Sequence, residues 1–194
     1  AKVVADIPDS ADFDTVAIPG CASSPLGAAA FAKSVAEIVA RHEKPGKPVA
    51  SIVCGQGAFD MWMEAGSGGM LMAPMANMLT VFDKALEISV KRNPFTRLPF
   101  EFYVTDYIHA IHEAATLYAL LKARLENGRF ENLKMIVSHS KGNWAVLTVL
   151  LKLELLLEGG KIEVPQDLNL PIDIVTLGNP VNLPDMHAGM KTLF

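Results

Sequence analysis

Short runs rich in β-branched residues alternate along this chain with longer segments in which hydrophobic residues recur at helical spacing. A strand followed by such a helix is the βα unit, and successive βα units feed their strands into one parallel sheet. The pattern therefore predicts an α/β fold with a doubly wound, mostly parallel sheet in a single domain over residues 1–194. The predicted strands are residues 15–18, 49–54, 134–137 and 172–177.

The first predicted helix follows the first strand. It begins after Ser23 and Ser24, whose hydroxyls suit the N-cap position of a helix, and it ends before Pro45. Hydrophobic residues three and four positions apart define the face that we expect to be buried. They are Phe31, Val35, Ile38 and Val39.

Two further helices are predicted in the second half of the chain. One begins at Thr105 and ends at Asn127-Gly128, where glycine can adopt the left-handed conformation of a C-cap. The other spans residues 141–158 and is followed by a pair of glycines. The residues predicted on the buried face of the earlier helix are Ile108, Ile111, Leu117, Leu120 and Leu121.

The regular alternation breaks between residues 61 and 102. Six of the nine methionines lie between Met61 and Met78, together with Trp62 and the glycine-rich run at residues 66–69. Methionine is a flexible packing residue, so one interpretation is ordinary core filling. The other is a cap or lid that lines a pocket for an aliphatic group, with the glycines as its hinge. We favour the interpretation of residues 61–102 as a candidate cap inserted into the domain.

A serine between the third strand and the last helix carries the candidate chemistry. The segment Ser138-His139-Ser140-Lys141-Gly142 is a variant of the G-x-S-x-G nucleophile elbow, a tight strand-to-helix turn. The turn crowds the positions two before and two after the nucleophile, and both residues there are small. It lifts the Ser140 hydroxyl clear of the sheet and directs the Lys141 amide at a developing oxyanion. His139 is predicted to point away from the hydroxyl and to serve in packing.

Three segments together resemble the α/β-hydrolase superfamily, in particular its lipase and esterase branch. Besides the serine motif, residues 175–181 are similar to the strand and turn that follow the nucleophile helix in class 3 lipases. Residues 16–20 resemble the strand whose exit loop supplies the second oxyanion amide, a role that would fall to Cys21 or Ala22. The resemblance implies a Ser140 acyl-enzyme and an ester of a lipid or other acyl group as substrate.

The sequence departs from the family pattern in two ways. Its motif opens with Ser138 where glycine is usual. The family order is nucleophile, acid and then histidine, and His187 is the only histidine after Ser140. Asp185 is the candidate acid and His187 the candidate base, but no strand separates them to position each one. We therefore expect the true base to lie in a remaining portion of the protein or in a second chain, and residues 1–194 to be an incomplete domain.

Composition and charge narrow the classes of partner. With 51% hydrophobic residues and a mean hydropathy of +0.28, the chain can bury a sizeable core. A net charge of −4 and the lack of a Lys/Arg cluster argue against nucleic acid as a partner. The longest apolar run, residues 144–157, contains Lys152 and Glu154 and is predicted to be a buried helix rather than a transmembrane segment. No secretory signal is recognisable, which leaves the compartment open.

Histidine and cysteine residues form no recognisable metal site in the sequence. His109 and His112 lie three positions apart on a predicted helix beside Glu113, but further ligands cannot be identified. Cys54 ends the predicted strand at residues 49–54, and Cys21 follows the one at residues 15–18. Both would lie at the same edge of adjacent strands, so a disulfide between them stays open. The sequence predicts neither a metal nor a cofactor.

The preferred function is ester hydrolysis, in which Ser140 attacks the carbonyl carbon and backbone amides hold the oxyanion. Acyl transfer to an alcohol or a thiol would use the same residues. The alternative from another class is a non-catalytic α/β module that keeps the elbow as a feature of the fold and binds a lipid or a protein. Labelling with a serine-directed fluorophosphonate probe distinguishes the enzyme from the module.

Overall fold

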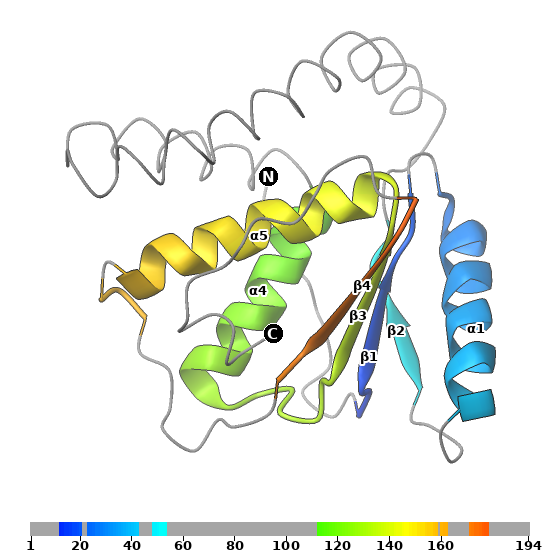
Figure 1. Ribbon diagram of the computed structural model, residues 1–194, viewed down its shortest axis with the longest axis horizontal. Coiled ribbons are helices and arrows are strands. Elements are labelled where there is room, and N and C mark those ends of the chain that lie inside the picture. The colour runs from blue at the N-terminus through cyan, green and yellow to red at the C-terminus, as the bar shows by residue number, and fades with distance from the viewer. Residues whose placement is uncertain are drawn as a thin grey trace, which may run out of the picture.

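Four parallel strands form one sheet in the computed structural model of the chain (Figure 1). The structure describes residues 12–20, 23–42, 48–53, 112–158, 160–162 and 171–178. The predicted α/β class with a parallel sheet is confirmed at the level of these four strands. They are β1 (Thr15–Ile18), β2 (Val49–Ser51), β3 (Met135–His139) and β4 (Asp173–Leu177), in the order β2-β1-β3-β4.

The strand order reverses direction at β1. The chain passes from β1 outward to β2 and later returns to the other side of β1 to form β3. Ile18 at the end of β1 therefore pairs with Ser138 in β3, and His139 at the end of β3 pairs with Leu177 in β4. The exits of β1, β3 and β4 consequently lie next to one another at the carboxyl edge of the sheet.

Helices cover both faces of the sheet. Helix α1 (Pro25–His42) lies on one face, and α4 (His112–Asn127) and α5 (Lys141–Glu158) lie on the other (Figure 1). Because successive strand residues point to opposite faces, Ala17 and Val137 pack toward α1 while Ile18 and Ile136 pack toward α4 and α5. The larger core is on the α4 and α5 side. Each buried Leu or Ile there contributes roughly 1.5–3 kcal/mol, so this side supplies most of the stability.

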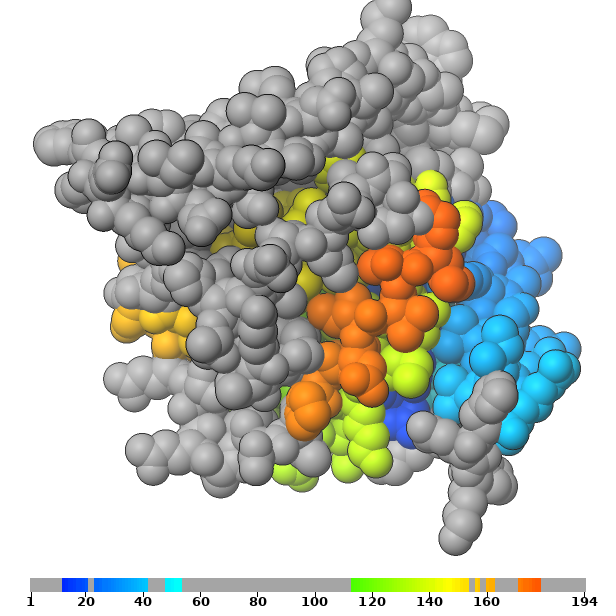
Figure 2. Space-filling model, in the orientation of Figure 1, coloured from blue at the N-terminus to red at the C-terminus, as the bar shows by residue number. Residues whose placement is uncertain are grey.

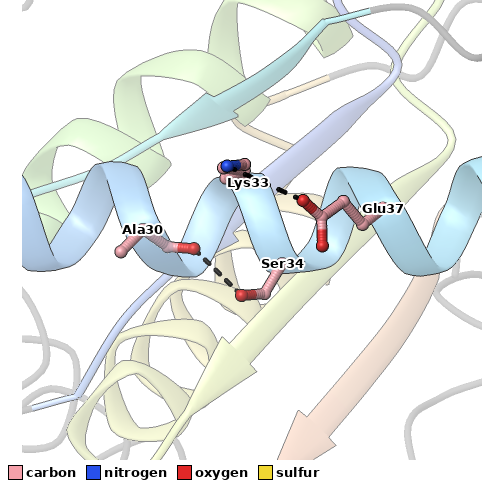
Figure 3. Close-up of polar contacts among 4 residues, drawn as sticks. All are labelled: Ala30, Lys33, Ser34 and Glu37. Carbon is pink, nitrogen blue, oxygen red and sulfur yellow. Dashed lines mark hydrogen bonds and ion pairs between the residues drawn. The ribbon is translucent and has the colours of Figure 1, made fainter.

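The outer face of α1 carries Lys33, Ser34 and Glu37, whose side chains interact locally. Lys33 Nζ lies 3.8 Å from Glu37 Oε1, and Ser34 Oγ donates a 3.1 Å hydrogen bond to the carbonyl oxygen of Ala30 (Figure 3). Both contacts join residues one helical turn apart. Exposed pairs of this kind add only a few tenths of a kcal/mol, about 0.3–0.5 for an i,i+4 ion pair. The position of α1 is therefore set by its other face.

The buried face of α1 differs from the predicted one at a single residue. Val35 is buried against the sheet, and Phe31 and Val39 pack at the edge of the same cluster. The prediction that Ile38 is buried is wrong, because its side chain is 57% exposed. Ala32 occupies the sheet-facing position instead, and its small side chain lets the helix approach closely while Ile38 falls at the margin of the apolar stripe.

The ends of α4 and α5 are those predicted from glycine positions. Gly128 follows α4 with φ of 63°, and its amide donates to the carbonyl oxygen of Arg124 at 3.1 Å. Gly160 follows α5 with the same φ, and its amide donates to Leu157 at 3.1 Å. Positive φ costs glycine little, so each helix can close on a left-handed residue. Leu117, Leu120 and Leu121 of α4 are buried as predicted, whereas Ile108 and Ile111 lie outside the described residues.

Helix α5 is buried on every side over its first half. All residues from Gly142 to Leu150 are buried, which confirms the predicted buried helix. In the described ranges, no helix is long and apolar enough to cross a membrane.

On α4, burial lowers the pKa of the Arg124 guanidinium. Burial, with a further contribution from Glu126, raises the pKa of the Tyr118 hydroxyl.

The strand bounds differ slightly from the prediction. Strand β3 extends through His139, two residues beyond the predicted end, because Ser138 and His139 pair with the last two residues of β4. Strand β2 ends at Ser51, although the Ile52 amide still donates to β1. Strand β4 is one of the two outer strands of the described sheet. Its alternate residues Val175 and Leu177 are 38% and 42% exposed, and β4 is visible at the surface in Figure 2.

Candidate active site

Ser140 is the only residue between β3 and α5. The strand ends at His139 and the helix begins at Lys141, so the chain reverses from strand to helix within one residue. That reversal gives Ser140 a φ of 50°, in the left-handed region. For a residue with a Cβ atom this region costs about 1–2 kcal/mol. Such strain persists only where the surroundings enforce it, and strained residues of this kind concentrate at functional sites.

Backbone hydrogen bonds hold Ser140 in this conformation. Its amide donates to the carbonyl oxygen of Leu177 at 3.1 Å, and its own carbonyl oxygen accepts from the Asn143 amide at 3.0 Å. The first bond ties the turn to the end of β4, and the second ties it to the first turn of α5. Among the described residues, the Ser140 hydroxyl makes no hydrogen bond, and the residue is half-buried. The side chain is therefore not used as a helix cap.

Two glycines allow the backbone to close around this turn. A Cβ atom at Gly142 would lie 2.5 Å from the carbonyl oxygen of Ile18, so α5 begins directly against the end of β1. A Cβ atom at Gly20 would lie 3.1 Å from Ser140 Cβ, which places the exit of β1 against the serine. The prediction that the position two after Ser140 is crowded is confirmed. Only glycine fits there without a shift of the backbone.

Ser140 also lies where the topology favours a binding site. In open parallel sheets, ligands bind beyond the carboxyl ends of the strands, at the point where the strand order reverses. Here that point lies between β1 and β3. Ser140 directly follows β3, and Gly20 follows β1 by two residues. The strained serine and the topological switch point therefore coincide, although they are independent observations.

Lys141 contributes two different groups to this region. As the first residue of α5, it presents its amide at the positive end of the helix dipole. Its side chain runs back to α4, where Lys141 Nζ lies 2.9 Å from Glu113 Oε1. The Glu113 side chain is 2% exposed and that of Lys141 18% exposed, so this ion pair is largely shielded from water. It fastens the start of α4 to the residue that follows Ser140.

In the sequence, Glu113 lies beside His109 and His112, a grouping for which no further metal ligands can be identified. The structure pairs its carboxylate with Lys141 instead. No group of three or more His, Cys, Asp or Glu residues in the described ranges is arranged to hold a metal ion. His109 and the side chain of His112 lie outside the described part of the structure.

Ser138 and Asn143 form a buried polar pair beneath the turn. Ser138 Oγ donates a 2.7 Å hydrogen bond to Asn143 Oδ1, and Asn143 Nδ2 donates at 3.1 Å to the carbonyl oxygen of Leu177. Ser138 takes the place of the first glycine of the motif, and its hydroxyl has an acceptor. Sequence reasoning missed Asn143. The available signal was a polar residue three positions after the serine, directly before the longest apolar run of the chain.

His139 lies on the other side of β3 from Ser138. The centroid of its ring is 6.2 Å from that of Phe31 in α1. Cβ atoms at Gly20 and Gly178 would approach the His139 ring nitrogens at 2.9 and 3.3 Å, so the imidazole lies between the exits of β1 and β4. One side of the ring therefore packs against these segments, although His139 as a whole is exposed.

Several residues predicted for the site lie outside the described ranges. Cys21 and Ala22, the alternatives for the second oxyanion amide, follow Gly20 directly. The candidate acid Asp185 and candidate base His187 follow the last described residue, Gly178. Cys54 and the candidate cap at residues 61–102 are likewise outside. Of the residues predicted for the site, the structure therefore describes Ser138, Ser140, Lys141 and Gly142.

Comparison of the chain with protein-family models, with curated proteins and with solved structures finds no match.

Proposed function

We propose that this chain is a serine hydrolase with an α/β-hydrolase-like fold, similar to the lipases and esterases, that cleaves carboxylic esters through an acyl-enzyme on Ser140. The observation that carries the proposal is the left-handed φ of 50° at Ser140, on a one-residue turn between a parallel strand and a buried helix. A nucleophile elbow requires this strained strand-to-helix turn. An ordinary helix-capping serine does not, because an N-cap residue normally has φ and ψ in the β region.

The neighbourhood of the turn supports the same proposal. The resemblance to class 3 lipases requires the end of the strand at residues 16–20 to lie close to the serine. These two segments are far apart in sequence. Ile18 pairs with Ser138, and the backbone at Gly20 lies against Ser140. The residues that follow Gly20 are Cys21 and Ala22, which the proposal assigns as alternatives for the second oxyanion amide. An unrelated turn serine would have no need of this arrangement.

The proposed reaction proceeds by acyl transfer in two steps. Ser140 Oγ attacks the ester carbonyl carbon while a general base takes the hydroxyl proton, and the carbonyl oxygen becomes an oxyanion. The amides of Lys141 and of Cys21 or Ala22 donate hydrogen bonds to it. The carbon–oxygen bond to the alcohol then breaks, and the alcohol leaves with the proton. Water repeats the attack on the acyl-enzyme and releases the acid and Ser140.

The general base is a histidine in this proposal. His187, oriented by Asp185, is the candidate within the sequence, and a histidine from a remaining portion of the protein or from a second chain is the alternative. The two are distinguished by substituting His187. If His187→Ala leaves ester hydrolysis unchanged, the base is supplied from elsewhere.

The proposed substrate is an ester with an aliphatic acyl group. The methionine-rich segment at residues 61–102 supports this choice, because flexible apolar side chains suit an acyl pocket. Acyl transfer to an alcohol or thiol would use the same serine and amides. Adding an alcohol as competing acceptor and measuring the ratio of transfer to hydrolysis separates the two reactions.

The experiment that tests the proposal is hydrolysis of p-nitrophenyl esters of increasing acyl length by the intact protein. We expect a burst of p-nitrophenol equal to the number of folded molecules, followed by slower turnover, with a preference for longer acyl chains. Ser140→Ala should abolish the burst. A folded protein that shows neither burst nor turnover, and does not react with a fluorophosphonate, would instead be the non-catalytic binding module.

A further inference from the structure

The polar pair beneath Ser140 is unusual in its burial. Ser138 and Asn143 are each 0% exposed, although both carry hydrogen-bonding side chains. Leaving such groups without partners would be costly, so buried polar side chains are normally bonded. The two hydrogen bonds that Asn143 makes connect three segments around the turn. Ser138 lies in β3, Asn143 in the first turn of α5, and Leu177 at the end of β4.

The chemistry of the groups fixes the direction of each bond. The carbonyl oxygen of Leu177 can only accept, so the amide nitrogen of Asn143 must face it, at 3.1 Å. Asn143 Oδ1 then faces Ser138 and can only accept, so the Ser138 hydroxyl donates to it at 2.7 Å. A carboxylate at position 143 would have the same shape but would place an oxygen against the Leu177 oxygen.

The same carbonyl oxygen of Leu177 also accepts from the amide of Ser140, at 3.1 Å. Both of its lone pairs are therefore engaged, one by the backbone of the strained residue and one by the side chain of Asn143. A shift of the end of β4 would weaken the bond to Ser140. Asn143 restrains that shift from α5, and Ser138 in turn fixes the rotamer of Asn143.

We propose that Asn143 and Ser138 are positioning residues that hold Ser140 in its left-handed conformation by anchoring the Leu177 carbonyl group. This inference rests on the proposed function and deepens it. It also gives a reason for serine at the position where the family has glycine. The Ser138 hydroxyl fills the buried space and orients the asparagine, which a glycine could not do.

The test measures the reactivity of Ser140 and the local order of the turn in the same variants. The first readout is the second-order rate constant for reaction of the intact protein with a fluorophosphonate, per folded molecule. We expect Asn143→Ala to lower it about tenfold to hundredfold, since small misplacements of a nucleophile have effects of this size. The isosteric Asn143→Asp should lower it at least as much. Ser138→Ala should lower it by roughly twofold to tenfold, the worth of one net hydrogen bond.

The second readout is hydrogen exchange of the Ser140 amide, which does not depend on any reactivity. Asn143→Ala should speed this exchange about tenfold or more by local opening, while the Ile136 amide in the middle of β3 keeps its protection. The matched control is Thr148→Val. Thr148 is also a buried polar residue of α5, but its hydroxyl donates only within the helix, to Trp144 at 2.8 Å. Thr148→Val should leave both readouts unchanged.

Each outcome bears on the inference separately from the proposed function. If Asn143→Asp reacts like the wild type, or if exchange of the Ser140 amide is unchanged in Ser138→Ala and in the Asn143 variants, the positioning role is overturned. If the wild type does not react with the probe but the exchange effects appear as expected, the proposed hydrolase function fails while the anchoring of the turn stands. Should the Asn143 variants not fold, Ser138→Ala decides the question, because it removes only one hydroxyl.

Discussion

Two helices of this protein begin just after a serine, and the two serines are used in different ways. Ser24 precedes α1, and its Oγ accepts a 3.2 Å hydrogen bond from the Gly27 amide, so it is a conventional N-cap. Pro25 follows at the first helical position, where proline is favoured. Ser140 precedes α5, but its hydrogen bonds among the described residues come from its backbone. The hydroxyl of Ser24 is therefore used to cap a helix, whereas among the described residues the hydroxyl of Ser140 makes no hydrogen bond.

The difference comes from the length and the constraints of the two turns. Six residues separate β1 from α1, and a chain of that length can reach a relaxed capping geometry. One residue separates β3 from α5, and it is held from three sides by Leu177, Asn143 and the backbone near Gly20. A short, over-constrained turn can maintain a strained residue.

The largest expected difference is in activity. If the proposed function is right, Ser140→Ala should lower ester hydrolysis by roughly 10⁴-fold or more, as removal of the catalytic serine does in known serine hydrolases. Ser24→Ala, at the other helix start, should leave the rate per folded molecule near that of the wild type. Turnover of a p-nitrophenyl ester by the two purified variants measures both effects. Equal losses of hydrolysis rate in the two variants would show that Ser140 and Ser24 do not differ in their role in the reaction.

The next largest effect concerns Lys141, the first residue of α5, whose side chain is held by an ion pair. Pro25, the first residue of α1, has no charged group that could form one. Lys141→Met would leave the 2% exposed Glu113 carboxylate without its cation, a change that costs about 3–5 kcal/mol for a buried pair. Glu113→Gln should cost less, because Lys141 is 18% exposed and its ammonium group can reach water. Urea unfolding of both variants gives the comparison. A larger loss for Glu113→Gln would contradict the role of the pair as described.

A third comparison uses the glycine near the start of each helix. Gly142→Ala should destabilise the protein by about 1–3 kcal/mol or more, because the new Cβ atom would meet backbone rather than a flexible side chain. Gly27→Ala should stabilise it by about 0.5–1 kcal/mol, since alanine is the better helix former. The nearest atom to a Cβ at Gly27 is Ser24 Oγ at 3.6 Å, an ordinary contact. Thermal unfolding should give melting temperatures that move in opposite directions.

The smallest effect is on stability at the two serines themselves. Ser140→Gly relieves a strain of about 1–2 kcal/mol and loses about 0.5–1 kcal/mol to the greater freedom of the unfolded chain, which leaves a small net gain. Ser24→Ala removes a cap and should cost about 1 kcal/mol. Denaturant unfolding is precise enough to give the sign of each change. A clear loss of stability in Ser140→Gly would mean that the left-handed turn is not strained.

Much of the local structure could be predicted from the sequence because it depends on local signals. The strand at residues 15–18, the helix at residues 141–158 and the glycine at position 128 were all correctly placed, since periodicity and glycine act over a few residues. The tight strand-to-helix turn at Ser140 could be predicted because a short motif lies between a strand and a helix. The exposure of Ile38 could not be predicted. Either edge of an apolar stripe can be buried, and the choice depends on how the helix packs on the sheet.

The contacts that complete the site depend on residues distant in sequence. The end of β3 was set by pairing with β4, the partner of Glu113 came from another helix, and Asn143 acts through Leu177. Hydrophobic periodicity carries no information on these pairings. The pairing of Ile18 with Ser138 likewise follows from the strand order, which the sequence did not determine. The resemblance to lipases implies that these two segments lie close together, and the pairing of β1 with β3 agrees with that placement.

The central claim is that the turn between β3 and α5 presents Ser140 as a nucleophile, and mapping of a fluorophosphonate adduct tests it most directly. The intact, folded protein would be treated with the probe, digested and sequenced by mass spectrometry. We predict one adduct on Ser140, none on Ser24, and no adduct after Ser140→Ala or after unfolding in urea. An adduct that persists in Ser140→Ala, or a folded wild-type protein that never forms one at residue 140, would contradict the claim.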